Sequence, residues 1–477
     1  MAKKTHTITD FQETGMNPDI RGSSGASLIE HFNVDYASTL EHSWDFTVST
    51  HPTATIQSLA LIDFTLAAGG LYGVGVRHDD SAKPAVYKWS SNNYRWEDHF
   101  DFTGNGSADK IVYYQDNFYG YVGTKIWTNT LAGGSLNESW QTFTGSADPV
   151  HHTKDDTLYF FSTNVVASLN GVTWNAAALT LPADFTITTA SEYGNYLAIG
   201  GYDSNSKRST VFLWDRDSGL TTLTERYDWG AENLKHIAVL EGSLVGVSLS
   251  TSSVNSPVSE RILMTIKRLV GGAPLVINQF KKTTITIGGK FVHQDKLYFG
   301  LSGFETADRP RFVACVDGLG RFILEQKIHD ADISTGLAPT AVYTEGEGWW
   351  ATAQDSSDKK AYHTSSAVAD IASYETLKYT AKDFINNLDF VGATIMTEPL
   401  PTAGQIILKS RKDEETAWTT LATFTTDNAL KHSVTKSAAE TSPSIGKEVQ
   451  FRIESTGGAN ITGFQVTFDE VKSQAYG

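Results

Sequence analysis

Thr157-Leu158-Tyr159-Phe160-Phe161 is a short apolar run entered through the polar segment Lys154-Asp155-Asp156, and it decides the fold because it recurs. Such runs are rich in aromatic residues and glycine, and a polar turn precedes them. Their starts lie at intervals of roughly 40 to 50 residues, which is the period of four-stranded propeller blades. The other six copies lie at 70–74, 117–121, 195–199, 243–247, 296–300 and 348–352.

A second hairpin follows the repeated run. Phe312 to Val316 turns at Asp317 to Gly320 and returns as Arg321 to Leu324. Asp, Asn and Gly between two β-rich runs indicate a hairpin, because these turns need φ > 0. Each repeat therefore supplies four strands. Seven repeats predict an all-β fold with an approximately seven-bladed β-propeller over residues 53–372, in which neighbouring blades bury each other's faces. Six or eight blades remain open.

The two ends of the chain do not match the repeat. In residues 1–52, Asp19 to Ala26 has the composition of an extended arm that packs along its own domain or reaches a neighbour. Trp44 to Val48 is a candidate strand for closing the last blade. Residues 373–477 contain short strands of alternating apolar and polar residues, such as Gly446 to Glu454, and predict a small C-terminal β-sandwich.

Composition excludes several classes of function. The 477 residues carry a net charge of −16, which repels phosphate backbones and argues against a nucleic-acid partner. The single cysteine, Cys315, excludes a disulfide framework and a cysteine metal site, and its apolar surroundings predict burial. Without an apolar run of about 18 residues we expect no membrane insertion. Without an apolar segment after Met1 to His6 we expect no cleaved signal and synthesis in a cytoplasm.

Candidate chemical sites are few. Asp215 to Gly219 resembles the start of a calcium loop but lacks the later carboxylate, which favours a plain turn. His151 and His152 are neighbours on a strand, so their side chains point to opposite faces and do not form a metal site. Asp79-Asp80 and Asp155-Asp156 have the pattern of solvated turn acids. Ser168 to Trp174 resembles an Asp-box turn with one residue missing and Asn in place of Asp. The sequence predicts no catalytic residue, no cofactor and no metal ion, and therefore no enzyme.

Tryptophans recur in the outer hairpins, where they either pack between blades or stack on sugars. The repeated position favours packing. These tryptophans are Trp89, Trp96, Trp127, Trp140, Trp174 and Trp214.

Segments near both termini resemble those of a known class of proteins. Asp19-Ile20-Arg21-Gly22-Ser23, followed by His31-Phe32-Asn33, the propeller and the terminal sandwich together resemble virion structural proteins of tailed bacteriophages. The sandwich contributes Glu398-Pro399-Leu400-Pro401, Ala417 to Leu421 and Gly446 to Glu454 to this resemblance. It implies a component of the virion, in the tail or adsorption apparatus. Such a component acts as a protein–protein interaction scaffold and binds other virion proteins and copies of itself. The alternative is a carbohydrate-binding or glycan-cleaving propeller that contacts a host-surface glycan.

Overall fold

The structure of the protein is a computed structural model. It is all-β, with no α-helix among the described residues. None of these residues form a helix with the length and apolarity that a membrane crossing requires. The described residues are 3–8, 26–30, 32–34, 40–42, 44–52, 60–216, 225–250, 263–281, 285–303, 311–328, 338–345, 348–354, 359–368, 371–381, 386–436 and 445–472.

The chain divides into two compact units. The propeller unit comprises Thr47–Gly320 and His329–His363, and the sandwich unit comprises Met1–Phe46, Arg321–Ile328 and Thr364–Gly477. The sequence analysis expected three segments, 1–52, 53–372 and 373–477. Most of the N-terminal segment, Met1–Phe46, instead shares a unit with the C-terminal strands, because β1, β2 and β4 pair with strands of that unit.

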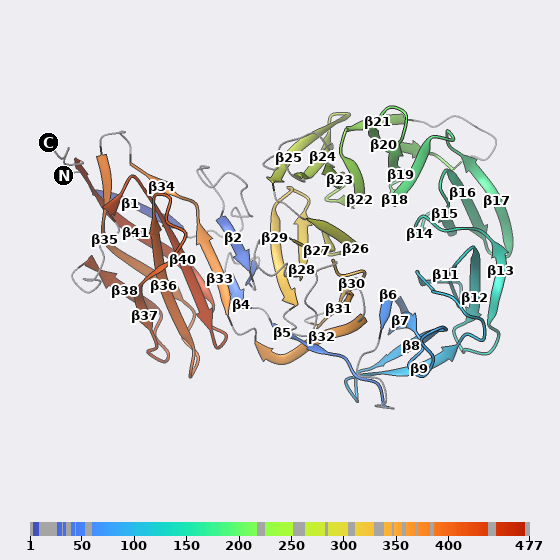
Figure 1. Ribbon diagram of the computed structural model, residues 1–477, viewed down its shortest axis with the longest axis horizontal. Coiled ribbons are helices and arrows are strands. Elements are labelled where there is room, and N and C mark those ends of the chain that lie inside the picture. The colour runs from blue at the N-terminus through green and yellow to red at the C-terminus, as the bar shows by residue number, and fades with distance from the viewer. Residues whose placement is uncertain are drawn as a thin grey trace. The chain divides into compact units, whose positions relative to one another are not determined.

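Five antiparallel sheets of four strands repeat through the propeller unit, and each of these five consists of strands consecutive in the chain. Figure 1 shows these sheets following one another around the unit from β6 to β31. The first five sheets are β6 (Leu61–Ala67), β7 (Gly70–Val76), β8 (Pro84–Ser90) and β9 (Arg95–Asp101); β10 (Val112–Tyr114), β11 (Asn117–Val122), β12 (Lys125–Thr130) and β13 (Asn137–Thr142); β14 (Ala147–His152), β15 (Thr157–Phe161), β16 (Val165–Asn170) and β17 (Thr173–Thr180); β18 (Phe185–Tyr193), β19 (Tyr196–Asp203), β20 (Arg208–Trp214) and β21 (Glu225–Gly230); and β22 (Asn233–Leu240), β23 (Ser243–Ser250), β24 (Leu263–Val270) and β25 (Ala273–Lys281).

Two further blades complete the series. In the sixth, β26 (Thr286–His293), β27 (Lys296–Ser302) and β28 (Arg311–Asp317) pair in order. In the seventh, β30 (Val342–Glu345), β31 (Gly348–Gln354) and β32 (Lys359–Val368) are joined by β5 (Trp44–Val48) as the fourth strand. Strand β5 is the segment for which the sequence suggested a closing role. Directly after it, the backbone N–H of Ser49 donates to the carbonyl of Ala361 at 2.8 Å.

The seven repeated runs of the sequence are the second strands of the seven sheets: β7, β11, β15, β19, β23, β27 and β31. The turns that precede them have the expected left-handed backbone. Gln115 and Asp116 have φ of 46° and 60°, and Gln294 and Asp295 have φ of 48° and 56°. Two consecutive residues with positive φ form the hairpin turn whose twist matches that of the flanking strands. This local chemistry explains why the repeat is visible in the sequence.

Apolar side chains fill the space between neighbouring sheets. Leu71 and Tyr87 of the first sheet pack with Tyr343 and Ala361 of the seventh, so the last sheet lies against the first. Cys315 is buried, as predicted. The tryptophans confirm the packing interpretation: Trp96, Trp127 and Trp214 are fully buried, and Trp89, Trp140 and Trp174 are partly buried against other aromatic rings.

Two sheets form the sandwich unit. One has the order β3 (Phe32–Val34), β4 (Leu40–His42), β41 (Ile461–Lys472), β35 (Asn386–Thr397) and β38 (Lys431–Thr435), with β1 (Lys3–Ile8) on β41 and β39 (Ile445–Gly446) on β35. The other has the order β29 (Phe322–Ile328), β2 (Ala26–Glu30), β33 (Ala372–Thr376), β40 (Glu448–Thr456), β36 (Gln405–Lys412) and β37 (Thr419–Phe424), with β34 (Tyr379–Thr380) on β40.

Phenylalanine rings from both sheets form the core of the sandwich unit. Phe451 of β40 packs against Phe390 of β35 and against Phe464 and Phe468 of β41, with ring centroids 5.7–5.9 Å apart. Strand β1 pairs with β41 from Lys3 opposite Asp469 to Ile8 opposite Phe464. Strand β1 therefore packs within the chain's own sandwich. Of the N-terminal residues that carry the resemblance, Asp19 to Ser23 and His31 lie outside the described residues.

Candidate functional site

Five titratable side chains lie on or next to the first strands of five sheets of the propeller unit. We call Asp63, Lys110, Asp148, His236 and Lys290 the inner-strand cluster. The pairing register shifts beside four of these positions, in β6, β14, β22 and β26. A β-bulge redirects the side chains next to it, and bulges are frequent near functional sites. The first strands thus depart from regular pairing where they carry charge.

The members of the inner-strand cluster contact one another and the neighbouring backbone. Lys110 Nζ lies 2.7 Å from Asp148 Oδ1. Lys290 Nζ donates to Thr189 Oγ1 at 3.0 Å, to the Ala190 carbonyl at 2.8 Å and to the Ile237 carbonyl at 3.1 Å. Lys290 therefore joins the first strands of three sheets through one ammonium group.

Asp63 and His236 anchor the two ends of the inner-strand cluster to backbone groups. Asp63 Oδ2 accepts a hydrogen bond from the Ile111 N–H at 3.1 Å. His236 Nε2 lies 2.5 Å from the Gly288 carbonyl, so this nitrogen carries the proton and donates. These two contacts also cross from one sheet to the next.

Burial and mutual charge set the protonation of the cluster. Burial raises the pKa of Asp63, against the effect of Lys110, and Asp148 raises it further. Burial opposes ionisation of Asp148 too, but Lys110 and Lys290 outweigh it and lower the pKa of Asp148. Burial and then Lys290 lower the pKa of His236 to about 3.

The lysines of the cluster differ from each other. Burial lowers the pKa of Lys290 to about 8, whereas for Lys110 the carboxylates of Asp148 and Asp63 overcome burial and raise the pKa. At neutral pH the cluster holds two ammonium groups and a neutral imidazole. Asp148 is a carboxylate, and so is most of Asp63, whose pKa is about 6. Two adjacent cations disfavour a metal ion at His236. The cluster contains neither a nucleophile with an adjacent base nor a carboxylate pair free of lysine partners, and it suits a polar group.

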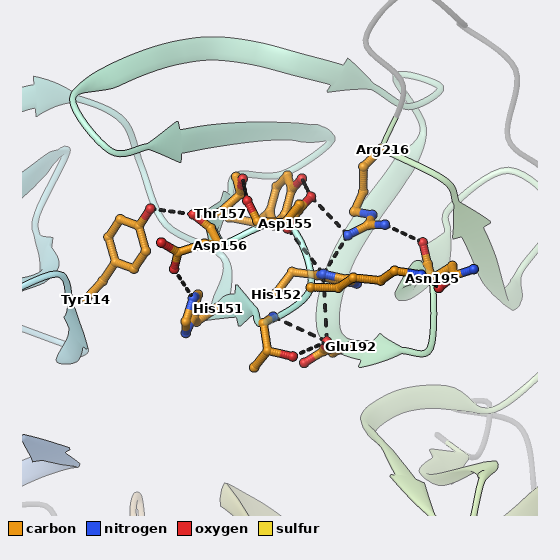
Figure 2. A network of polar contacts seen from close by, with 12 residues as sticks. Tyr114, His151, His152, Asp155, Asp156, Thr157, Glu192, Asn195 and Arg216 are labelled. Atoms are coloured by element: carbon orange, nitrogen blue, oxygen red, sulfur yellow. Dashed lines mark hydrogen bonds and ion pairs between the residues drawn. The ribbon is translucent and has the colours of Figure 1, made fainter.

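A second polar network surrounds the turn from β14 to β15, shown in Figure 2. His151 Nε2 lies 2.9 Å from Asp156 Oδ1, whereas His152 Nδ1 lies 3.2 Å from Asp155 Oδ1 and 2.5 Å from Arg216 Nη1. The two histidines thus point to different partners, as predicted from their adjacency on a strand. Burial and then Arg216 lower the pKa of His152. A cation already occupies the side of His152 where a metal ion would approach.

Several acidic groups of this network are fixed by the protein rather than free in solvent. Asp155 Oδ2 lies 2.9 Å from Arg216 Nη1 and accepts from the Tyr159 hydroxyl at 3.0 Å. Glu192 Oε1 accepts from the Thr153 hydroxyl at 2.7 Å. The prediction of solvated turn acids is wrong for Asp155, because its carboxylate has an arginine and a tyrosine as partners.

The remaining candidates from the sequence are structural turns. Asp79 pairs with Arg77, and Asp80 accepts from the Ala82 N–H at 3.1 Å. The Asp-box-like segment forms the β16–β17 hairpin, in which Gly171 has φ of 56°. Of the calcium-like segment, only Asp215 and Arg216 lie within the described residues.

An exposed apolar surface follows the outer strand of the fifth sheet. Strand β25 is the last strand of its sheet, and Leu275, Val276 and Ile277 are 50%, 49% and 39% exposed. Val270 of β24, 47% exposed, extends this surface. Outer strands with exposed apolar residues are pairing sites unless something covers them. We call Val270 and Leu275 to Ile277 the β25 surface.

Sequence reasoning did not identify the inner-strand cluster, although a signal was present. Asp63, Lys110 and His236 each lie seven residues before a repeated run, at Gly70, Asn117 and Ser243. When a repeat is mostly apolar, a titratable residue that recurs at a fixed position in it indicates a polar cluster. A third group, His51, His78 and Asp98, was also missed, and its residues share no local pattern.

Comparisons with known proteins identify no family. No protein-family model matches the chain, and no curated protein matches it. Among solved structures, Sqt1 from Chaetomium thermophilum is similar at 11% sequence identity and a TM-score of 0.42, over 71% of this chain and 85% of that chain. A likeness of this size carries no argument about function. Function must therefore be argued from the surfaces and clusters above.

Proposed function

We propose that this chain is a structural component of a tailed-phage particle, in the tail or adsorption apparatus, where it acts as a protein–protein interaction scaffold. The observation that carries the scaffold role is the β25 surface. Three consecutive apolar side chains, exposed on both faces of an outer strand, suit another protein segment that packs on the strand or adds a strand beside it. The phage context is supported by the resemblance of the two termini.

The described residues favour a scaffold over an enzyme. The inner-strand cluster pairs Asp148 with Lys110, and the turn network pairs Asp155 with Arg216. Groups held in this way stabilise neighbouring strands and are poorly placed to exchange protons with a substrate. The partners we propose are other virion proteins and further copies of this chain.

A glycan-binding propeller is the competing function. It has the polar inner-strand cluster in its favour, since several polar side chains gathered on neighbouring first strands suit a hydroxyl-rich ligand. Sugar-binding sites also need exposed aromatic faces, and the propeller tryptophans singled out from the sequence pack between strands instead. The scaffold proposal accounts for the exposed apolar residues, which a glycan site does not need.

The test is co-sedimentation of the chain with intact particles in a lysate of its source phage, measured with a specific antibody. We expect a fixed copy number per particle. The variant Val276→Lys should reduce incorporation at least about tenfold by placing a charge in an apolar contact. Val172→Lys is the matched control, because Val172 is 99% exposed in a turn on another sheet.

A chain that is absent from particles overturns the phage role, and equal incorporation of the two variants overturns the role of the β25 surface. Binding of the purified chain to a host-derived glycan, lost when Lys290 is replaced by Met, would support the competing function.

A further inference from the structure

Two histidines and one aspartate converge beside the first sheet of the propeller unit. His51 lies three residues after β5, His78 lies two residues after β7, and Asp98 is in β9. One ligand atom from each lies within 4.8 Å of the other two. Among the described residues this is the one group of three or more His, Cys, Asp or Glu with that geometry.

A single carboxylate oxygen lies at the centre of the group. Asp98 Oδ1 is 3.1 Å from His51 Nε2 and 3.2 Å from His78 Nδ1. Two ligands bound tetrahedrally to one zinc ion at about 2.0–2.1 Å are about 3.3 Å apart. The two nitrogen–oxygen distances therefore match those of a metal site without any movement of the chain.

Hydrogen bonding alone does not explain why the Nδ1 atom of His78 is buried next to Asp98. Its Nδ1 atom is buried and has no hydrogen-bond partner among the described residues, although Asp98 Oδ1 lies at 3.2 Å. A buried nitrogen at this distance from a carboxylate, yet poorly aligned with it, loses the stabilisation of a hydrogen bond. A metal ion between the two atoms would satisfy both.

The rings of the two histidines are held in place by their surroundings. The His51 and His78 rings stack with centroids 4.2 Å apart, and His51 packs edge-on against Tyr87 at 5.7 Å. The His51 and His78 side chains are only 7% and 14% exposed, whereas Asp98 is 46% exposed. The buried histidines give a rigid site, and the exposed aspartate leaves a path for an ion and positions for water ligands.

The donor set selects the class of ion. Two imidazole nitrogens and one carboxylate oxygen suit divalent transition metals such as zinc, cobalt or nickel. Calcium and magnesium prefer oxygen ligands alone. Three protein ligands leave at least one coordination position for water.

The position of His51 gives the site a structural role. Ser49 is bound to the seventh sheet through the Ala361 carbonyl and through His363 Nδ1, which lies 2.9 Å from Ser49 Oγ. The Thr50 carbonyl accepts from the Trp96 N–H of β9 at 3.1 Å. The segment that carries His51 therefore runs from the seventh sheet to the first.

We propose that His51, His78 and Asp98 bind one divalent transition-metal ion, and that this ion fastens the segment after β5 to the first sheet. The bound ion would stabilise the junction between the first and seventh sheets, because binding to the folded state alone shifts the folding equilibrium. This inference is independent of the proposed function.

The test uses the untagged full-length chain, since a histidine tag itself binds zinc. The chain is stripped with a chelator and titrated with zinc chloride in a calorimeter, and with cobalt(II) under an absorption spectrometer. We expect one ion per chain, visible cobalt absorption bands, and a higher melting midpoint with zinc. His78→Ala and Asp98→Asn should each weaken zinc binding at least about tenfold, since changes to even indirect ligand contacts cost 10–100-fold.

His151→Ala is the matched control. His151 also lies beside a turn aspartate, Asp156, at 2.9 Å, but it has no second histidine directed at the same oxygen. Its removal should leave zinc affinity and the cobalt spectrum unchanged. If His78→Ala fails to fold by circular dichroism, the half-exposed Asp98→Asn decides. Absence of zinc binding by the folded wild-type chain, or unchanged affinity in Asp98→Asn, would overturn the proposal.

Discussion

The propeller unit contains two pairs of histidines that differ in sequence separation and in what they contact. His151 and His152 are adjacent in the chain, and each contacts a different aspartate. His51 and His78 are 27 positions apart, yet they stack and approach the same oxygen of Asp98. Adjacent residues on a strand face opposite sides of the sheet, so the side chains of His151 and His152 are held apart. The fold, by contrast, brings His51 and His78 together although they are distant in the chain.

The two histidine pairs also differ in their contacts with arginine. Arg216 lies against His152 and Asp155, so the adjacent pair already has its positive charge. In the distant pair, the Asp98 carboxylate has the largest charge effect on the pKa of His51 and raises it, and Arg95 has a smaller, opposite effect. The comparison shows that a histidine pair is a candidate metal site where both rings face a carboxylate, and not where an arginine contacts one of the rings.

Replacing Arg216 by Met should have the largest effect. The Arg216 side chain is 11% exposed and contacts Asp155, His152 and the Asn195 carbonyl. Removing one partner of a mostly buried ion pair costs about 3 kcal/mol, since the other charge stays uncompensated. The unfolding free energy should fall by that amount in a denaturant titration, and the pKa of His152 should rise in an NMR titration.

Arg208→Met is the control for this prediction. Arg208 pairs with Asp228 in a half-exposed contact at 2.8 Å, and such pairs contribute about 0.5 kcal/mol. Equal losses in the two variants would contradict the distinction between a fixed network and a solvated pair.

A fifth histidine sharpens the comparison, because His236 contacts a backbone carbonyl instead of a carboxylate. Its pKa is about 3 in the folded unit against 6.5 in a solvated chain, owing to burial and then to Lys290. Below pH 6.5 the unfolded chain binds a proton that the folded unit does not, so stability is lost as the pH falls from 6.5 toward 3. From about pH 7.5 to about pH 5 this loss amounts to about 2 kcal/mol.

The variant His236→Gln isolates that effect, because glutamine retains an N–H donor for the Gly288 carbonyl and does not titrate. The unfolding free energy of the wild type should therefore fall about 2 kcal/mol further than that of the variant over the same pH range. Parallel pH profiles of the two proteins would show that His236 protonates normally in the folded unit.

The smallest effect concerns the tyrosine beside each histidine pair. Tyr159 donates to Asp155 Oδ2 at 3.0 Å, and Tyr87 donates to the Val76 carbonyl at 3.0 Å. A hydrogen bond to a charged acceptor is worth more than one to a neutral acceptor. Tyr159→Phe should therefore lower the unfolding free energy by about 1.5 kcal/mol and Tyr87→Phe by about 1 kcal/mol. The reverse order would contradict the stronger hydrogen bond of Tyr159.

Features set by local chemistry were predictable from the sequence. The apolar runs such as Thr157–Phe161 and the turns before them recur because each blade needs the same hairpin, and the structure has a strand at every one. The burial of Cys315 and of the tryptophans follows from the same alternation. The opposite directions of His151 and His152 needed only the geometry of one strand.

Features that depend on contacts between residues far apart in the chain could not be predicted from local sequence patterns. Lys3–Ile8 is polar and has no strong strand pattern, and it forms β1 because β41 offers an edge. His51 approaches His78 only because β5 joins the seventh sheet. Asp63 and Lys290 meet polar partners only because the first strands of different sheets lie together. No window of sequence contains both members of these contacts.

The pairing of β1 with β41 has a consequence for the time course of synthesis. A ribosome adding about 5–20 residues per second takes roughly half a minute to a minute and a half to pass from one strand to the other. During that interval β1 has no partner while the strands between residues 8 and 461 are synthesised. Strand β41 supplies its hydrogen-bond partner, so the sheet that holds β1 is completed only after β41 has been synthesised.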